Sequence, residues 1–273
     1  MSKLYKPRAP LAPQRGFTLV ELMVTVAIAV FLLFGLVKVV ENIRGANANQ
    51  QALALLQDEQ RFALTVMTDV IQQGGYFPTT APPQTYTLTT ALPVFSGPQA
   101  WEVYQVAQPF TGSHPAATGP DTIGVRYRTA KNDGVILCDG STNTTIAPDQ
   151  VYASQFYVVP PVGAVPGQLM CQLSIGANTN AAVSLITGLQ SMVIWYGVNR
   201  TSPSTTYNID TYLTADQMCS NSASPCGFDD WSNVSAVRVQ LTFVNPLASQ
   251  PGQPATIVIE RVIEVMSRAG VHT

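Results

Sequence analysis

Hydrophobic residues form one long block near the start of the chain, whereas later they alternate with polar residues in short segments. The block runs from Gln14 to Val40, and Glu21 is the single charged residue between Arg15 and Lys38. About twenty apolar residues are enough to cross a bilayer as one helix. A carboxylate inside such a helix is costly in lipid unless another group pairs with it. The block therefore predicts a membrane-spanning helix in which Glu21 needs a partner.

The helix is predicted to continue beyond the membrane. From Glu41 to Gln73 there is no proline and one glycine, Gly45, and the residues are mostly good helix formers. Apolar positions recur near helical spacing at Leu53, Leu56, Ala63, Met67 and Val70, with Leu55, Phe62 and Val66 widening the stripe. Gly74 and Gly75 form a stop signal. We expect one helix of about fifty residues, roughly 80 Å long, with an amphipathic second half packed on a sheet.

After Pro78 the pattern changes to a loop rich in proline, threonine and alanine up to about Pro98, and then to short β segments. The clearest alternation is in Ala236–Asn245, where every second residue is apolar. The other predicted strands are Trp101–Ala107, Thr122–Arg128, Gly134–Cys138, Val151–Val159, Gln168–Ser174, Leu189–Val198 and Ala255–Ser267. Because no second long helix is apparent, antiparallel hairpins fit better than βαβ units. The fold class is therefore α+β, a long N-terminal helix on an antiparallel sheet.

Charge predicts the orientation of this chain in the membrane. Lys3, Lys6, Arg8 and Arg15 precede the apolar block and no acidic residue does. By the positive-inside rule this basic leader stays in the cytoplasm, and everything after Val40 lies on the other side. A net charge of −2 argues against nucleic acid as a partner of the whole molecule. One small basic cluster, formed by Arg126, Arg128 and Lys131, is expected on a solvated strand face.

The four cysteines then lie in a compartment where disulfides persist. Cys219 and Cys226 bracket a short polar loop that a disulfide could close, and Cys138 and Cys171 remain as a second pair. Four cysteines allow three connectivities, and the sequence does not select one. A zinc site is disfavoured because there is no C-x₂-C motif and no histidine near a cysteine.

Motifs for catalysis or cofactor binding are missing from the sequence, which contains no G-x-S-x-G elbow, no H-E-x-x-H and no P-loop. We therefore expect no catalytic residues, no cofactor and no metal ligands. Asp229 and Asp230 could help to hold Ca²⁺, but adjacent acidic residues more often lie on a solvated turn.

The segment from Arg15 to Leu22, RGFTLVEL, resembles the processing site of type IV prepilins and of type II secretion pseudopilins. The resemblance implies that a prepilin peptidase cuts after Gly16 and that the new N-terminal residue, Phe17, is methylated. It also implies that Glu21 pairs with the α-amino group of Phe17 in a neighbouring subunit, which would offset the burial cost of both charges. The expected division is a cytoplasmic leader (1–16), a transmembrane and filament-core helix (17–40), an amphipathic continuation (41–75) and a periplasmic β-rich domain (76–273).

Two further segments are similar to PilW-type minor pilins. One is Arg61–Leu64 followed by Gly74–Tyr76, and the other is Tyr196–Asn199 followed by Asp230-Trp231 and Val234–Leu241. Asn199 departs from the pattern, which has aspartate there, so a role tied to that acid is in doubt. The resemblance implies a pilin-like fold and a place in the bacterial inner membrane, with the domain in the periplasm and, after assembly, in the pilus. Implied partners are other minor pilins, the major pilin, the prepilin peptidase and, before assembly, inner-membrane lipid.

The sequence thus predicts a non-enzymatic minor pilin that starts or caps a type IV pilus. Two alternatives remain open: a minor pseudopilin of type II secretion related to pseudopilin J, and a periplasmic adhesin or enzyme that uses the helix only as a tether. Neighbouring genes would decide the first, and the N-terminus of the mature protein would decide the second.

Overall fold

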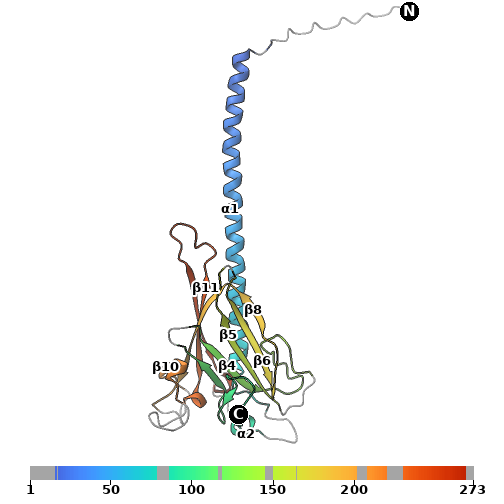
Figure 1. Ribbon diagram of the computed structural model, residues 1–273, viewed down its shortest axis with the longest axis vertical. Helices are drawn as coiled ribbons and strands as arrows, with labels where there is room; N and C mark the ends of the chain where they lie inside the picture. Colours follow the sequence, from blue (N-terminus) through green and yellow to red (C-terminus); the bar gives the residue numbers. More distant parts are fainter. Residues whose placement is uncertain are drawn as a thin grey trace, which may run out of the picture. The chain divides into compact units, whose positions relative to one another are not determined.

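The computed structural model describes residues 16, 18–78, 86–115, 119–144, 150–163, 165–201, 208–219 and 230–268. The chain divides into two compact units, Met1–Gln51 and Ala52–Thr273. The first unit contains the apolar part of the N-terminal helix, and the second contains the rest of that helix and all strands (Figure 1).

Helix α1 spans Leu19–Gln72 and ends one residue before the predicted boundary. A turn follows, in which the Gly74 N–H donates to the Ile71 carbonyl and Gly75 has a φ of 78°. Only glycine adopts such a φ without strain, which explains the stop. The buried residues of α1 are Leu56, Ala63, Met67, Val70 and Ile71. Leu55 and Phe62 are 62% and 50% exposed, so the predicted widening of the stripe is wrong for these two.

The larger sheet follows the order β3-β4-β5-β6-β7, with β8 also pairing with β6, and every pairing is antiparallel. Its strands are β3 Phe110–Ser113, β4 Thr122–Arg128, β5 Val151–Val159, β6 Gln168–Ile175, β7 Asn178–Thr179 and β8 Val183–Thr187. The bounds of β4 and β5 agree with the prediction. Strands β3, β7 and β8 were not predicted, because they are short and lack a clear alternation.

The second sheet has the order β10-β9-β11-β12, again antiparallel throughout. It consists of β9 Leu189–Val198, β10 Thr211–Leu213, β11 Ala236–Val244 and β12 Thr256–Glu264. The apolar residues of β11 are buried in alternation with half-buried polar ones, as its sequence predicts. The long N-terminal helix and the antiparallel sheets confirm the predicted α+β class.

Two parts of the β prediction need correction. The region read as loop before Pro98 contains helix α2, Leu88–Ala91, which is capped by Thr87, and strand β1, Phe95–Ser96, which pairs with β2, Val103–Tyr104. Gly134–Cys138 is not a strand and makes an isolated bridge between Ile136 and Thr142. The Asp133 carboxylate accepts the N–H groups of Ala130 and Val135 there, so the backbone turns instead of extending.

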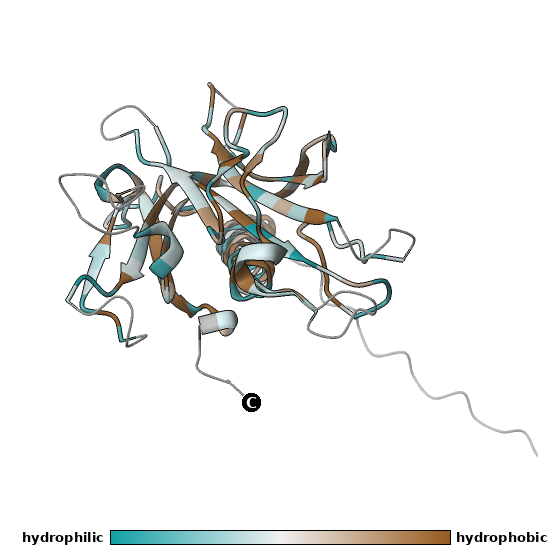
Figure 2. Cartoon of the chain, turned by 90° about the horizontal axis from the view of Figure 1, so that it is seen from below, coloured by the Kyte–Doolittle hydropathy of each residue, from teal (hydrophilic) through white to brown (hydrophobic). Residues whose placement is uncertain are grey.

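The core lies where the second half of α1 meets residues from both sheets. Met67 and Ile71 of the helix belong to the same buried cluster as Phe156 of β5 and Leu241 of β11. Hydrophobic and polar residues alternate along the strands, as the striped colouring in Figure 2 shows. Three short 3-10 helices complete the fold: η1 Ala215–Gln217, η2 Trp231–Asn233 and η3 Met266–Arg268.

Candidate functional site

The N-terminus of α1 is organised by Thr18, which precedes the first helical residue. Its Oγ1 accepts the Glu21 N–H at 3.3 Å, and its carbonyl accepts the Leu22 N–H at 3.2 Å. Thr18 followed by Glu21 three residues later is the sequence signature of a capping box, in which the hydroxyl satisfies an otherwise free N–H. Thr18 was not among the residues predicted from the sequence, although its spacing from Glu21 carried the signal.

The helix begins beyond Gly16, whose backbone is exposed and non-helical. A Cβ built on Gly16 meets no atom within 4 Å, so the surrounding fold does not require glycine at this position. Phe17, the predicted methylation site, lies outside the described residues. A requirement for glycine at residue 16 would therefore come from the predicted prepilin peptidase and not from the fold.

Glu21 is exposed on the first turn of α1, and no ion pair involves it in the part of the chain that the structure describes. The cap and the positive end of the helix dipole favour a carboxylate here. The predicted contact with the Phe17 amine of a neighbour would need a second subunit, and it stays a prediction.

The surface of α1 from Leu19 to Val40 is apolar on all sides and uncovered. Phe31, Phe34 and Leu36 are 78%, 68% and 62% exposed. By length and composition this helix can cross a membrane. The first basic residue of the helix, Lys38, pairs with Glu41 at 2.9 Å, but both side chains are mostly exposed and the pair adds little stability.

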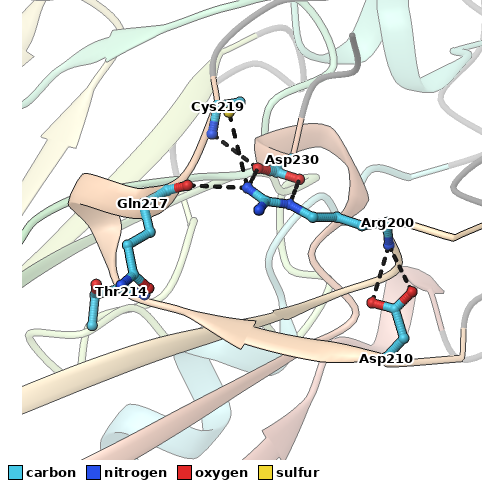
Figure 3. Close-up of polar contacts among 6 residues, drawn as sticks. All are labelled: Arg200, Asp210, Thr214, Gln217, Cys219 and Asp230. Carbon is cyan, nitrogen blue, oxygen red and sulfur yellow. Dashed lines mark hydrogen bonds and ion pairs between the residues drawn. The ribbon is translucent and has the colours of Figure 1, made fainter. Parts of the chain in front are cut away.

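In the β domain, Arg200 and Asp230 form the centre of a polar cluster that we call the clasp, made of Arg200, Asp210, Gln217, Cys219 and Asp230 (Figure 3). The Arg200 guanidinium donates to both carboxylate oxygens of Asp230, from Nε at 3.1 Å and from Nη2. Nη2 also donates to the Gln217 carbonyl at 3.0 Å. The Cys219 N–H donates to Asp230 Oδ2 at 2.9 Å.

The clasp also fixes the backbone at Arg200. The N–H groups of Arg200 and Thr201 donate to the Asp210 carboxylate at 2.8–3.1 Å. The Thr201 hydroxyl, followed by these N–H groups, holds the pKa of Asp210 below its ordinary value. The hydrogen bonds to Asp230 raise the pKa of Arg200. The clasp therefore ties the end of β9 to β10, to η1 and to the residues before η2.

Asp230 is 1% exposed and bound by a guanidinium, so the expectation of a solvated turn is wrong for this residue. Its carboxylate is engaged by Arg200 and by a backbone N–H, and no group of three or more metal-ligating side chains occurs among the described residues. Asp229 lies outside the described residues. Asn199, next to the clasp, is buried.

The structure joins Cys138 to Cys171, with 6.1 Å between their Cα atoms. This bond ties the segment after β4 to β6. Cys219 is also disulfide-bonded, and its predicted partner, Cys226, lies outside the described residues.

The basic cluster on β4 is not solvated, which corrects that expectation. Arg126 is fully buried and donates to the carbonyls of Gln108, Pro93 and Gln105, with its guanidinium 4.7 Å from the centre of the Tyr104 ring. Burial lowers the pKa of Arg126 to about 10. Arg128 is 7% exposed and lies over the Tyr86 ring, whereas Lys131 is exposed. The two arginines anchor residues 86–108 to the sheet and do not form a cationic surface.

Two family models match the chain. Residues 155–257 match the type IV pilus-assembly protein W family (PilW), and residues 11–37 match the prokaryotic N-terminal methylation motif. A type IV-like pilin from Thermus thermophilus is a similar solved structure, with 14% identity, 78% of this chain and 98% of that chain covered, and a TM-score of 0.37. No curated protein matches the chain significantly.

The two family matches confirm the predicted resemblance to PilW-type minor pilins. The methylation motif and the apolar helix that follows it fit a single-pass inner-membrane protein with a periplasmic domain and incorporation into a pilus.

Proposed function

We propose that this pilin-like protein with a PilW domain is a minor pilin that primes the assembly of a type IV pilus or caps it. The observation that carries the proposal is the surface of α1 from Leu19 to Val37, which is apolar on almost all sides and contains one charged residue, Glu21, near its start. A simple membrane anchor has no use for a carboxylate in that position. A helix that leaves lipid to pack against other helices can use this carboxylate, because a cation of a neighbouring helix can pair with it.

In this proposal residues 1–16 are a leader that the prepilin peptidase removes after Gly16, and Phe17 becomes the methylated N-terminus. Residues 17–40 span the inner membrane and later pack against other pilin helices. Residues 41–75 carry the helix into the domain formed by residues 76–273. The partners are other minor pilins, the major pilin and, before assembly, lipid. The protein acts by binding and catalyses no reaction.

The test is the mass of the mature protein, purified from cells that contain the prepilin peptidase. We expect an N-terminal peptide that begins with methylated Phe17. A matched control is Gly16→Val, which the open surroundings of Gly16 should tolerate in the fold but which should leave the leader attached. An intact leader on the wild-type protein would contradict the proposal.

A pseudopilin of type II secretion would share the same N-terminal chemistry. The two assignments differ in the filament that contains the protein. Cross-linking the mature protein in cells, followed by identification of its partners as pilus subunits or secretion subunits, separates them. Recovery of secretion subunits alone would overturn the pilus assignment but would not contradict the proposed cleavage after Gly16.

A further inference from the structure

In the part of the chain that the structure describes, strand β12 is the last strand of its sheet. All nine of its residues, Thr256–Glu264, pair with β11 in a continuous register without a bulge. Within the described residues, no strand pairs with its other side. Edge strands of this length are usually protected by proline, by a bulge or by charged side chains, because their free backbone groups recruit other strands. Strand β12 has no proline and no bulge, and its charged residues are Glu260, Arg261 and Glu264.

The hydrogen bonds at the two ends of the hairpin identify which backbone groups are free. The Val265 N–H donates to the Ser235 carbonyl at 2.9 Å, and the Asn245 N–H donates to the Ala255 carbonyl at 3.0 Å. In an antiparallel ladder such bonded pairs recur at every second residue. The odd-numbered residues of β12 therefore bond to β11. The N–H and C=O groups of the even-numbered residues point to the open edge: Thr256, Val258, Glu260, Val262 and Glu264.

The side chains of these same five residues share one face, because side chains alternate along a strand. Val258 and Val262 are 52% and 50% exposed. Glu260 and Glu264 are exposed beside them. The side chain of Glu260 is 45% exposed and pairs with Arg238 at 3.8 Å, whose guanidinium also lies over the Trp195 ring. The open edge thus presents a row in which valine and glutamate alternate.

We propose that the free edge of β12 binds an extended strand of another protein subunit, which adds to the sheet as its fifth strand. The backbone groups of Val258, Glu260 and Val262 supply the ladder. The side chains select a strand with apolar residues opposite Val258 and Val262 and basic residues opposite Glu260 and Glu264.

A second copy of this chain fits the edge less well. If two β12 strands paired antiparallel over their full length, Glu260 would lie opposite Glu260 of the other copy. In a parallel pairing in register, every glutamate would lie next to its equivalent. Like charges directly opposite each other destabilise a strand pair. The charge of the row therefore favours a basic partner strand over self-association.

The inference rests on the proposed function only in that a pilus subunit meets other subunits, and its first test needs no pilus. The probe is a nine-residue peptide with lysine and valine alternating on one face and threonine on the other. It is added to the full chain in detergent micelles, and amide hydrogen exchange is measured for each residue. At a peptide concentration ten times its Kd, exchange at Val258, Glu260 and Val262 should slow about tenfold. Exchange at Ile259 and Arg261, whose N–H groups already bond to β11, should change little.

Two variants make this test specific. Val258→Pro removes an N–H that points away from β11, and an edge strand tolerates proline at such a position. It should abolish the protection, whereas Val258→Thr, which keeps the N–H, should retain most of it. A peptide with glutamate in place of lysine should give no protection. Equal protection by both peptides, or protection that survives Val258→Pro, would overturn the proposal.

The second test is made in cells, with a photo-cross-linking amino acid at position 262. We expect cross-links to a segment of a different protein in which apolar and basic residues alternate. Cross-links to lipid, to a second copy of this chain or to nothing would overturn the proposal. Because leader cleavage is measured separately, its failure would count against the proposed function and not against the strand edge.

Discussion

Asp121 is a buried carboxylate that connects the two sheets. It is 2% exposed, its Oδ2 accepts the Ile194 N–H from β9 at 2.8 Å, and its Oδ1 lies 2.7 Å from His114 Nδ1. Burial raises the pKa of Asp121 above 3.8, although both contacts act in the opposite direction. A carboxyl group whose pKa is raised by folding stabilises the fold while it is protonated and loses that contribution as the pH rises.

We predict that Asp121→Asn changes the pH dependence of stability. Asparagine has the same shape and can accept the Ile194 N–H, but it does not ionise. The wild-type protein should lose stability relative to the variant as the pH rises from about 3.8, the ordinary pKa of an aspartate. The free energy of unfolding of both proteins, measured from pH 3.5 to 5.5, checks this. A constant difference across this range would contradict the prediction.

The clasp allows a double-mutant cycle. Arg200→Met leaves the Asp230 carboxylate buried without its cation, and we expect a loss of about 2–3 kcal/mol, below the range for fully buried pairs because the Arg200 side chain is 32% exposed. Asp230→Asn should also destabilise the domain. The double variant should lose less than the two single losses added together. Urea unfolding followed by the fluorescence of Trp231, which adjoins Asp230, measures the three values. Strict additivity would mean that the two residues do not act as a pair.

At the scale of single residues, the sequence predicts which charged and polar groups are present better than it predicts their burial and their partners. Arg126 belongs to a strand that was predicted correctly, yet its burial was not, because its acceptors are carbonyls of residues 92–108 that approach only in the folded domain. The same holds for Asp230, whose partner Arg200 lies thirty residues earlier. Thr18 differs from both, because its capping partner is three residues away and could have been found from the sequence.

Among the larger elements, the disulfide between Cys138 and Cys171 holds an irregular segment on the sheet. Their separation of 33 residues gives a loop-closure term of about 3–4 kcal/mol in the chain-entropy model. We predict that Cys138→Ala with Cys171→Ala lowers the free energy of unfolding by about that amount. Urea unfolding of the variant, compared with the oxidised and the reduced wild type, measures it. A variant as stable as the oxidised wild type would contradict the prediction.

Long elements with one strong period were predictable, and short ones were not. The apolar block was predictable from its unbroken length, and the strand Ala236–Val244 from a two-residue period over nine residues. Strands β7 and β10 have two and three residues, which is too short to show a period in the sequence. They form because a long neighbouring strand supplies hydrogen bonds. The strand predicted at Gly134–Cys138 does not form, because the Asp133 carboxylate binds nearby N–H groups and turns the backbone there. A local interaction overrode a weak strand pattern.

At the scale of the whole molecule, the sequence places its hydrophobic residues in two different ways. In the domain they alternate and are buried in one large cluster and a second, small one. In the first part of α1 they surround the helix and stay exposed, so this surface needs lipid or other helices to cover it. The alternating arrangement lets the domain bury its own hydrophobic residues. The apolar surface of the helix is buried only when lipid or other subunits cover it. In such an assembly the cost of burying Glu21 requires a cation beside it.

We therefore predict that Glu21→Ala is inserted and processed normally but assembles poorly. Alanine removes a carboxylate that is costly to place in lipid, so insertion should not suffer from the substitution. In a packed bundle it would meet the amine of Phe17 from a neighbour, and alanine would leave that amine buried and unpaired, which costs several kcal/mol. Glu41→Ala is a matched control, because Glu41 is an exposed acid on the same helix that already pairs with Lys38. Surface pili and the amount of this subunit in sheared filaments are measured for both variants. Filaments that contain Glu21→Ala at the wild-type level would show that the carboxylate does not act in assembly.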